Sequence, residues 1–553
     1  MKIKLIKGKK GDCQIIDIKE GVTAEEIYFR HREEFPYTAL IVKIDNEYKP
    51  LTTKIFEECT LEFLDIRVQA ANLVYQSSLS LVLLAAIYKV LGSVRVEIAN
   101  SLNQGLFTEI IGRDPMTDEE LSKVAAVMRS YIRDDRHIIR EEFSRKKGIS
   151  LLENTGQSEK FRLLKKSPQL KRLTFYSIDG YRNFFYGIMA PSTGYVSYFE
   201  LKRYKSGVVL RFPLPAKPDE LPKLFAQPKL YKAFGEQTRW DKLLGINYVE
   251  DLNEKIQEGR CGELIQLSEA LHEKKIAEIA DMIKKEGKRI ILIAGPSSSG
   301  KTTFARRLCI QLKVNGISAM YMGTDDYFVE RNETPIDENG ERNYEDIEAV
   351  DIGLFNRNMN DLLTGKEADI PTFDFMTGQK VFGKRLTRID KNQAIVIEGI
   401  HGLNSELTKE IPDSAKFKIY ISPLTQLNVD EHNRIPTTDE RMLRRLVRDY
   451  QFRGHSAADT IKLWPKVRAG EDKNIFPYSN EADVLFNSYH AYEIAVLKKY
   501  AEPLLREIGE DQEEYAEAQR MLQFLDFFMT ITDDSVIVNN SILREFIGGS
   551  IFV

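Results

Sequence analysis

The pattern of apolar and polar positions predicts a buried parallel sheet in the second half of the chain. Residues 289–294, Arg-Ile-Ile-Leu-Ile-Ala, form a β-branched and apolar run that is typical of a parallel strand covered on both faces. Apolar side chains then recur at helical spacing, at Phe304, Leu308 and Leu312. Residues 391–398 show the buried-strand pattern again, and a further strand is expected near Met320. We therefore predict a parallel sheet sandwiched by helices.

The first half of the chain has shorter and more mixed patterns. Residues 1–65 alternate strand-like runs with one helical stretch near Thr23. The most apolar stretch, residues 79–91, is interrupted by a serine and a lysine and is shorter than the roughly 20 residues needed to span a bilayer, so we predict a buried helix. Residues 262–287 place apolar side chains at near-helical intervals and are expected to form a connecting helix.

Length, composition and charge limit the classes of protein that fit. At 553 residues the chain is too long for one hydrophobic core, and about three or four domains are expected. Lys and Arg (79) nearly balance Asp and Glu (83), and the net charge of -4 predicts no gross affinity for nucleic acid, although a local basic face is compatible with it. The four cysteines lie far apart without a CxxC pair, which argues against a disulfide framework or a thiolate zinc site. A reducing cytoplasm fits best, and neither a signal peptide nor membrane association is expected.

A glycine-rich turn directly follows the strand at 289–294. Its sequence, Gly-Pro-Ser-Ser-Ser-Gly-Lys-Thr-Thr, satisfies the GxxxxGK[ST] pattern in the required order of strand, loop and helix; a chance match is the alternative. Such a loop directs backbone N–H groups at nucleotide phosphates, with Lys301 reaching the β and γ phosphates and the Thr302 hydroxyl binding Mg²⁺. The expected cofactors are Mg²⁺ and ATP, with GTP left open as the donor. The cofactor-binding candidates are Gly295, Pro296, Ser297, Ser298, Ser299, Gly300, Lys301, Thr302 and Thr303.

Two further segments place acids at the ends of predicted strands. Asp325 and Asp326 follow the strand near Met320, at the strand end where α/β sheets place ligands. One of them could take the proton of an attacking hydroxyl, although two acids beside a turn more often form a solvated loop. Glu398 ends the strand at 391–398 and could hold Mg²⁺ through water, as Walker B acids do. The alternative for Glu398 is a helix cap or a loop acid.

Arginines gather on a predicted helix further along the chain. They are Arg441, Arg444, Arg445 and Arg448, at spacings of three, four and seven. The spacing predicts one strongly cationic face. In a kinase lid such guanidiniums close over the transferred phosphoryl group, and a hinge at Gly454 favours that interpretation. In the alternative, the helix is solvent-exposed and has no role in binding, and the arginines pair with the acids Asp439, Glu440 and Asp449.

Together these segments resemble the uridine kinase and phosphoribulokinase family, over residues 288–510. The block Asp-Asp-Tyr-Phe at 325–328 resembles the family's DSFY or DSYY, and residues 343–349 resemble NFDHPDA. Residues 370–375 are similar to the IPxYDF block, and 444–454 contain elements like RRxxRD and RG. The resemblance implies a P-loop fold and transfer of the γ-phosphoryl group of ATP to a sugar hydroxyl.

The same resemblance implies roles for individual residues. It makes Asp325 the general base, with Asp326 as second choice, and it places Glu345 where uridine kinases have a ribose-contacting Asp. The catalytic set is Asp325, Lys301 and Arg448, and the metal-binding set is Thr302 and Glu398. The substrate-binding set is Asp325, Phe328, Glu345, Phe373, Arg445 and Arg448, and Arg453 joins the cofactor-binding set.

Two positions depart from the family pattern. Where uridine kinases have a His after the YDF block to read the base, this chain has Gly378, and the Arg expected after the lid RG element is His455. Loss of a base-reading side chain affects specificity more than chemistry. The expected acceptor is therefore a uridine-like or cytidine-like nucleoside or a related small molecule, with a non-nucleoside such as a sugar phosphate as the alternative.

The N-terminal half resembles parts of threonyl-tRNA synthetase. Residues 1–65 are similar to the TGS domain, a small β-grasp fold. Residues 66–225 resemble the second N-terminal, editing-type domain, through Ala-Pro-Ser-Thr-Gly at 190–194 and the apolar helix at 81–91.

The residues that carry editing chemistry in that family are replaced in this chain. Phe185 and Met189 stand where the CRGPH segment has its Cys and His, and Ser77 and Leu81 stand where the family has HxxxH. Apolar side chains replace neither a thiolate nor an imidazole in coordination or hydrolysis, so editing activity is not expected.

Basic runs in the same half raise a second hypothesis, RNA contact. The runs are 145–147, 165–166, 171–172 and 202–205, and the candidate stacking side chains are Phe175, Tyr176, Tyr181 and Tyr198. Such runs usually belong to solvated faces. The protein is then either a metabolic kinase or an RNA-binding or tRNA-sensing module that uses its nucleotide site as a switch. The acceptor-side motifs favour the kinase, because a switch needs no general base and no arginine lid.

The expected architecture is multidomain, α/β and α+β, and a homo-oligomer is expected. Its segments are a TGS-like β-grasp domain at 1–65, an editing-like domain at 66–225, a linker with the connecting helix at 226–287, a P-loop kinase domain at 288–510, and a helix and tail packed on the kinase at 511–553.

Overall fold

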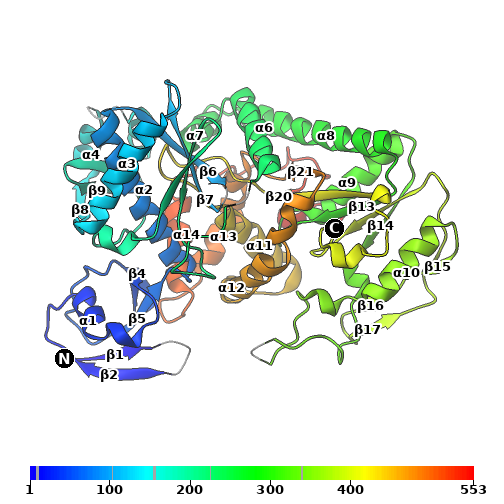
Figure 1. Cartoon of the computed structure of the whole chain (residues 1–553), viewed down its shortest axis with the longest axis horizontal. Coiled ribbons are helices and arrows are strands. Elements are labelled where there is room, and N and C mark those ends of the chain that lie inside the picture. Colours follow the sequence, from blue (N-terminus) through cyan, green and yellow to red (C-terminus); the bar gives the residue numbers. More distant parts are fainter. Residues whose placement is uncertain (8–11, 103, 154–156, 168, 225, 338–339) are drawn as a thin grey trace.

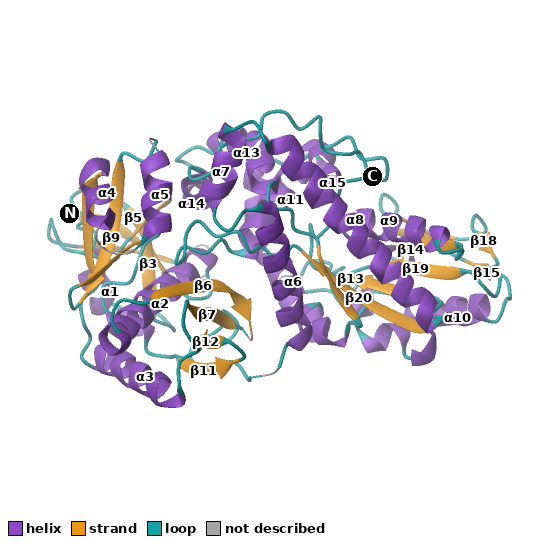
Figure 2. Ribbon diagram, turned by 90° about the horizontal axis from the view of Figure 1, so that it is seen from above, coloured by secondary structure: helices purple, strands orange, loops and turns teal. Residues whose placement is uncertain are grey.

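The computed structural model describes the whole chain except residues 8–11, 103, 154–156, 168, 225 and 338–339. The N-terminal segments form one side of the molecule and the P-loop segments form the other, with α11 to α14 between them (Figure 1). The view from above shows the same division, with the kinase sheet on the side away from the N-terminus (Figure 2).

The first 65 residues build a mixed sheet crossed by one helix. The sheet order is β2-β1-β5-β3-β4, with β1 parallel to β5 and the other pairs antiparallel. Thr23 caps the helix, because its hydroxyl accepts a hydrogen bond from the Glu26 N–H at 3.2 Å. This is the topology expected of a β-grasp fold, and membership of the TGS family stays a prediction. The elements are β1 Lys2–Ile6, β2 Cys13–Asp17, α1 Ala24–Arg30, β3 Ala39–Ile44, β4 Glu47–Lys49 and β5 Thr60–Asp65.

The next segment folds around a long helix, α2, and two antiparallel sheets. The sheet orders are β10-β9-β8 and β11-β12-β7-β6. Leu81 of α2, Phe185 and Met189 are buried together in its core. The elements are α2 Gln69–Leu91, β6 Arg95–Leu102, β7 Gly105–Ile111, α3 Asp118–Arg133, β8 Ile139–Ser144, α4 Arg145–Glu153, α5 Ser158–Lys166, β9 Arg172–Ile178, β10 Tyr181–Phe184, β11 Glu200–Tyr204 and β12 Gly207–Arg211.

Helix α2 confirms the buried helix predicted at 79–91 and begins ten residues earlier. In the described part of the chain it is the helix with the length and hydropathy of a membrane span. However, 83% of its most apolar window is buried inside the protein. Its apolar surface is therefore used for packing in the core.

The aromatic side chains proposed for RNA stacking occupy different environments. Phe175 and Tyr176 are 2% and 3% exposed in the core, so that interpretation is wrong for both. Tyr198 is 48% exposed. Some of the basic residues are engaged in ion pairs, such as Lys166 with Glu254, and RNA contact by these runs stays a prediction.

The second half contains a five-stranded parallel sheet in the order β14-β19-β13-β20-β21. Successive residues of β13 face opposite sides: Ile291 and Ile293 pack in the core that contains α8 and α9, whereas Ile290 and Leu292 pack against α10. Complete burial of each such side chain stabilises the fold by about 1.5–3 kcal/mol. The predicted sandwich is confirmed, with strands β13 Ile290–Ala294, β14 Ala319–Gly323, β19 Ala394–Glu398, β20 Lys416–Ser422 and β21 Val484–Asn487.

The predicted connecting helix exists but belongs to the kinase core. Helix α8 packs along α9, because Ile276, Ile279 and Ile283 enter the same hydrophobic cluster as Phe304. The domain boundary at residue 288 stays a prediction. The remaining elements of this region are α6 Pro228–Leu244, α7 Val249–Gln257, α8 Cys261–Glu286, α9 Lys301–Val314, α10 Ile352–Leu363, β15 Ala368–Asp369, β16 Thr372–Asp374, β17 Gln379–Val381 and β18 Leu386–Thr387.

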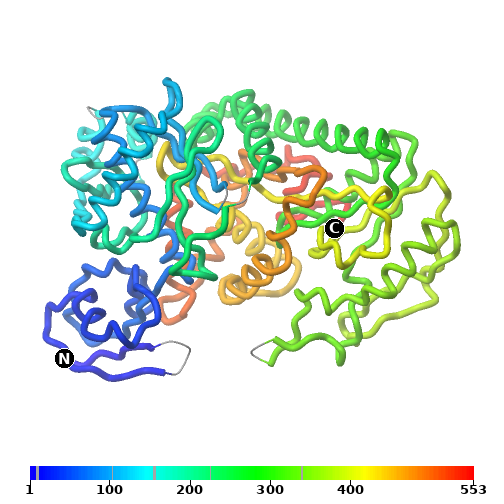
Figure 3. The backbone as a smooth tube through the Cα atoms, viewed as in Figure 1, coloured from blue at the N-terminus to red at the C-terminus, as the bar shows by residue number. Residues whose placement is uncertain are grey.

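The C-terminal segment contacts both halves of the molecule. Helix α14 packs against α13 and also against β4 of the N-terminal sheet. The tail then returns to the second half of the molecule, where α15 packs against α11 and the chain ends (Figure 3). The prediction that 511–553 packs on the kinase is therefore incomplete, because α14 also joins the kinase to the N-terminal half. The helices are α11 Thr437–Arg453, α12 Ala457–Asn474, α13 Glu493–Arg506, α14 Tyr515–Leu525 and α15 Arg544–Ile547.

Candidate active site

The order of the parallel strands brings the three sequence motifs to one edge of the sheet. Strand β19 lies between β13 and β14, and Glu398 at its end pairs in register with Ile293 on one side and Gly323 on the other. The P-loop leaves the end of β13, and Asp325 lies in a 3₁₀ turn directly after β14. Segments far apart in the chain thus place their side chains next to one another, at the edge where α/β sheets bind ligands.

The P-loop has backbone geometry that constrains its residue types. Gly300 is left-handed, with φ of 82°, and Ser298 has φ of 60°. A Cβ at Gly295 would lie 2.0 Å from the Ile421 carbonyl oxygen, so only glycine fits there. The Lys301 ammonium donates hydrogen bonds to the carbonyl oxygens of Gly295 at 3.0 Å and Pro296 at 3.1 Å. The lysine is therefore folded onto its own loop, with its charge held beside the predicted phosphate site.

Two serine hydroxyls of the loop fit a site that binds a polar ligand. The Oγ atoms of Ser298 and Ser299 are buried without a hydrogen-bond partner within the described structure. Buried polar groups are normally paired, because an unmade hydrogen bond costs about 1–3 kcal/mol. A helix N-terminus follows directly at Lys301, and its free N–H groups favour anions. This geometry fits the phosphates of a nucleotide.

The candidate metal ligands contact each other. The Thr302 hydroxyl donates to Glu398 Oε1 at 2.8 Å, and the Tyr321 hydroxyl donates to the same oxygen at 2.9 Å. Burial and the Glu398 carboxylate raise the pKa of Tyr321, so it stays a neutral donor. No group of three or more His, Cys, Asp or Glu side chains suited to a metal occurs among the described residues. The oxygens of Thr302 and Glu398 fit Mg²⁺, which uses few protein ligands together with substrate phosphates and water.

Asp325 has the properties of a general base. Its side chain is open to solvent on one side, but neighbouring protein atoms desolvate it and the charges of Glu398 and Glu345 disfavour ionisation. These effects, partly offset by Lys301, raise the pKa of Asp325 to about 6. A carboxyl with this pKa is ionised near neutral pH and basic enough to take a proton.

The second-choice acid, Asp326, is engaged elsewhere. Its Oδ2 accepts a hydrogen bond from Arg385 Nη1 at 2.6 Å, so the two form an ion pair. The same arginine also donates to the Pro371 carbonyl oxygen at 3.3 Å and joins the turn after β14 to the loop before β16. This contact gives Asp326 a structural role and favours Asp325 as the base.

The predicted acceptor residues form an aromatic cluster with one acid. The Phe328 ring packs edge-on against Phe373 and Tyr344, at centroid distances of 5.6 and 5.4 Å. Glu345 follows Tyr344 in the sequence, and its side chain lies against Gly470 of α12. Burial and the Glu471 charge raise the pKa of Glu345. The cluster offers an apolar wall and a carboxylate beside Asp325.

The arginine helix divides into two functional groups, which corrects the sequence prediction of one cationic face. Arg441 and Arg444 are 1% and 0% exposed. Arg441 pairs with Glu471, and Arg444 pairs with Glu493 at 2.6 Å. Both also donate to carbonyl oxygens of the P-loop, at Ser297 and Ser298. They hold the loop in place and, being buried and paired, are not groups of a solvent-facing lid.

The other arginines of α11 remain near the phosphate site. Arg445 Nη1 donates to the Ser297 hydroxyl at 2.8 Å. Arg448 and Arg453 both pair with Asp449, at 2.7 and 3.5 Å, and Gly454 ends the helix in a left-handed conformation. The side chain of Arg453 is 52% exposed, and that of Arg448 is 11% exposed. Arg448 and Arg453 thus both contact Asp449, and Arg445 contacts the loop.

Sequence reasoning missed two contacts made by the C-terminal tail. Glu545 of α15 accepts a hydrogen bond from the Thr303 hydroxyl at 2.8 Å and lies 3.3 Å from its backbone N–H. Ile542 packs so closely on Gly300 that a Cβ there would lie 2.4 Å from its side chain. No motif signals these residues, because they contact the P-loop from more than 230 positions away.

The two departures from the family pattern have different environments. Gly378 lies at the turn between β16 and β17 with φ of 72°, and a Cβ there would collide with the Arg331 side chain. A side chain at this position would be strained, so the local backbone itself excludes a base-reading residue. His455 follows the end of α11, and its Nδ1 is buried without a partner among the described residues.

Comparisons with known proteins agree with this geometry. Residues 290–495 match the model of the "Phosphoribulokinase / Uridine kinase family". These matches support a kinase domain of that family in the C-terminal half. The uridine kinases of Staphylococcus epidermidis and Staphylococcus aureus are each 29% identical over 208 residues, which cover 37% of this chain and 91% of those enzymes.

Two solved structures are similar to part of this chain. One is described as the "Structure of a Possible Uridine Kinase from Bacillus stearothermophilus", and that protein is 21% identical in sequence. The match covers 38% of this chain and 97% of that protein, with a TM-score of 0.26. The D-glycerate 3-kinase of Cryptococcus neoformans is 10% identical in sequence. The match covers 45% of this chain and 87% of that protein, with a TM-score of 0.21.

Proposed function

We propose that the protein is an ATP-dependent kinase that transfers the γ-phosphoryl group to a hydroxyl of a nucleoside, uridine-like or cytidine-like, or of a related small molecule. The observation that carries this proposal is the meeting of the P-loop, Glu398 and Asp325 on three neighbouring strands, with Asp325 at a pKa of about 6. The matches to uridine kinases support the reaction class.

Each group has a chemical task in this reaction. Asp325 takes the proton of the acceptor hydroxyl as its oxygen bonds to the γ-phosphorus, and the bond from that phosphorus to the bridging oxygen breaks to leave ADP. Lys301 moves from the loop carbonyls to the β and γ oxygens. Arg445 and Arg448 stabilise charge on the transferred group. Thr302 and Glu398 would hold Mg²⁺, which would supply positive charge to the phosphoryl transfer.

The acceptor side favours a ribose without committing to one base. We assign Glu345 and the aromatic wall of Phe328 and Phe373 to the binding of a sugar and a flat ring. The strained position of Gly378 removes the base-reading side chain, and this observation favours a second candidate acceptor, a sugar phosphate. We assign the enzyme to the cytoplasm on its cysteine content.

An ATP-consumption screen tests the proposal. Mg²⁺ and ATP are supplied with nucleosides, nucleoside monophosphates, sugar phosphates and other small alcohols, and the Lys301→Ala protein is the blank. Turnover with uridine or cytidine is expected. Turnover with a sugar phosphate alone would keep the kinase and replace its acceptor. If no compound supported ATP consumption while ATP binding was intact, the result would contradict the proposal and favour the switch hypothesis.

A further inference from the structure

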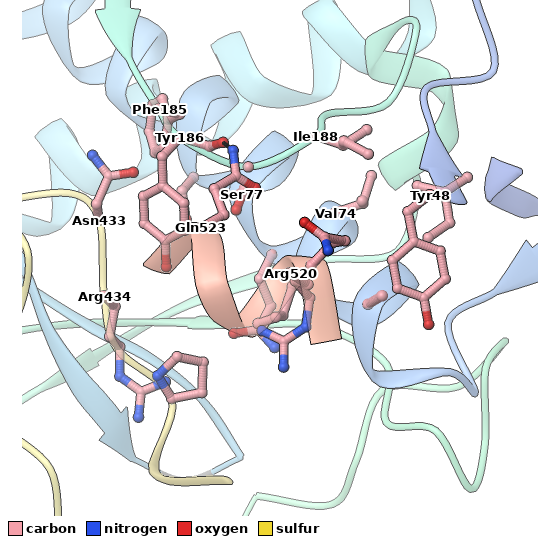
Figure 4. A pocket seen from close by; sticks show the side chains of 18 of the residues that line it. Tyr48, Val74, Ser77, Phe185, Tyr186, Ile188, Asn433, Arg434, Arg520 and Gln523 are labelled. Carbon is pink, nitrogen blue, oxygen red and sulfur yellow. Dashed lines mark hydrogen bonds between the residues drawn. The ribbon is translucent and has the colours of Figure 1, made fainter. Parts of the chain in front are cut away.

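A cavity of about 370 Å³ lies far from the P-loop, where the N-terminal half meets the kinase. Its walls come from β3, β4, α2, β6, β7, the loop after β10, the loop before α11 and α14. In the close view Tyr48 stands on the opposite side from Asn433 and Arg434 (Figure 4). The volume is in the range of small-molecule sites, about 300–1,000 Å³. Neither the P-loop nor the acceptor residues line this cavity.

Part of the wall is apolar and includes replaced family positions. Val74 and Ile188 present aliphatic side chains, and Phe185, which stands in place of the synthetase cysteine, presents an aromatic ring. Ser77, in place of a family histidine, lines the same space with a small side chain. The replacements thus leave an uncharged surface suited to a flat or branched apolar group.

The charged groups around the cavity are paired, with one exception. Arg520 binds Asp439 through two hydrogen bonds, at 2.7 and 2.8 Å, and also pairs with Glu517 at 2.6 Å. Lys49 pairs with Glu47.

His432 is satisfied on both ring nitrogens. Nε2 lies 3.1 Å from the Val96 carbonyl oxygen, and Nδ1 lies 2.9 Å from the Lys160 ammonium. Burial holds the pKa of His432 well below its usual range, so the ring is neutral. This side chain therefore adds hydrogen bonds within the wall but no charge.

Arg434 is the exception. Its guanidinium has no hydrogen bond or ion pair with any described residue, and its Nε is shielded from solvent without a partner. Burial lowers the pKa of Arg434 to about 10, so it is still a cation at neutral pH. The acid whose charge acts on Arg434, Asp439, is already paired with Arg520. An uncompensated cation in a partly buried wall is costly, unless an anion completes the site.

We propose that this cavity binds a small molecule that carries a carboxylate or phosphate beside an apolar or aromatic group. The anionic group pairs with Arg434, and the apolar group lies against Val74, Phe185 and Ile188. The Tyr186 hydroxyl and the Gln519 amide, which also line the space, supply further polar contacts. This site is separate from the kinase reaction and does not depend on the identity of the phosphoryl acceptor.

The test uses the full-length protein and 8-anilinonaphthalene-1-sulfonate, an aromatic anion whose fluorescence rises on binding. Saturating Mg-ATP blocks the nucleotide site throughout. Saturable binding is expected, and Arg434→Gln should weaken it by about tenfold or more, because a charge-assisted hydrogen bond is lost. Ser77→Phe should weaken it similarly by filling the cavity. The matched control is Arg172→Gln, at a side chain that is 70% exposed, and it should leave binding unchanged.

Competition identifies the chemistry of the ligand. Phenyl phosphate and benzoate should displace the dye, and the better competitor tells whether phosphate or carboxylate is preferred. Benzyl alcohol should not compete; equal competition by this neutral compound would overturn the role of Arg434. Binding that is unchanged in both Arg434→Gln and Ser77→Phe, or absent under saturating Mg-ATP, would overturn the proposal. Displacement by polyuridylate but by neither small anion would do the same and favour RNA.

Each variant is checked for folding by its thermal transition and by its Mg-ATP binding. If Arg434→Gln does not fold, Ser77→Phe together with the competition series still decides the proposal. Retained nucleotide binding with lost dye binding locates the effect at this cavity.

Discussion

The phosphate edge of the kinase sheet and the cavity near Arg434 use charge in opposite ways. At the sheet edge, the charges of Glu398 and Glu345 disfavour the ionisation of Asp325, and Lys301 partly offsets them. At the cavity one unpaired cation, Arg434, stands in a largely apolar wall beside the paired Lys49 and Arg520.

The two arrangements of charge suit different chemical tasks. Crowded carboxylates raise a pKa and create a base, which suits proton transfer and phosphoryl chemistry. An isolated cation beside apolar groups performs no proton transfer at neutral pH, but it can select an anion. Changes at the sheet edge should therefore alter rates, whereas changes at the cavity should alter binding of a second ligand.

Replacing the P-loop lysine should have the largest effect. Lys301→Ala removes the cation that neutralises the β and γ oxygens, and a comparable charge on the transferred phosphoryl group is worth at least about 10³-fold in kcat. Steady-state ATP consumption measures this loss. Lys313→Ala, at the far end of α9, is the matched control and should act as wild type. Near-normal turnover of Lys301→Ala would remove the P-loop from the mechanism.

Asp325→Asn should lower kcat by about 10²-fold or more, because an amide cannot take the hydroxyl proton. The affinity for ATP, measured separately by equilibrium binding, should change little. Asp326→Asn is the matched comparison: it weakens the ion pair with Arg385 but leaves the base, so kcat should fall less than tenfold. If Asp326→Asn lowered kcat by the amount expected for Asp325→Asn, and Asp325→Asn did not, Asp326 would be assigned as the base.

The contrast between these two acids shows how far sequence alone reaches. Local patterns predicted the strands and the P-loop, since strand, glycine turn and helix are adjacent in the chain. They also placed Asp325 and Glu398 at strand ends, and the parallel sheet then brings them together. The pairing of Asp326 with Arg385 was not predictable, because the partner lies 59 residues away on an irregular loop.

Long-range packing explains the other misses. The spacing of Arg441 and Arg444 predicts a shared helix face, but their partners Glu471 and Glu493 come from α12 and α13, which periodicity cannot orient. Arg434 lies in no motif, and its cavity is assembled from strands, helices and loops far apart in the chain. The fold of each segment was thus more predictable than the contacts between segments.

The pH dependence should follow the ionisation of Asp325. Its pKa is raised to about 6, first by desolvation and then by Glu398. Only the ionised carboxylate takes a proton, so kcat/KM should fall about tenfold per pH unit below about pH 6 and level off above it. Rate profiles from about pH 5 to 8 measure this limb. The residual activity of Asp325→Asn should lack it, and a limb that persists in that variant would assign the titration to another group.

The smallest effect is expected at the tail. Glu545→Ala removes the acceptor for the Thr303 hydroxyl, and one hydrogen bond of this kind contributes about 1 kcal/mol. If α15 braces the P-loop in its binding form, the Kd for Mg-ATP should rise about fivefold. Glu545→Gln keeps an acceptor oxygen in place, so its Kd should change less than twofold. Equal losses in both variants would point to the negative charge as the important feature, and no loss in either would limit the tail to packing by Ile542 against Gly300.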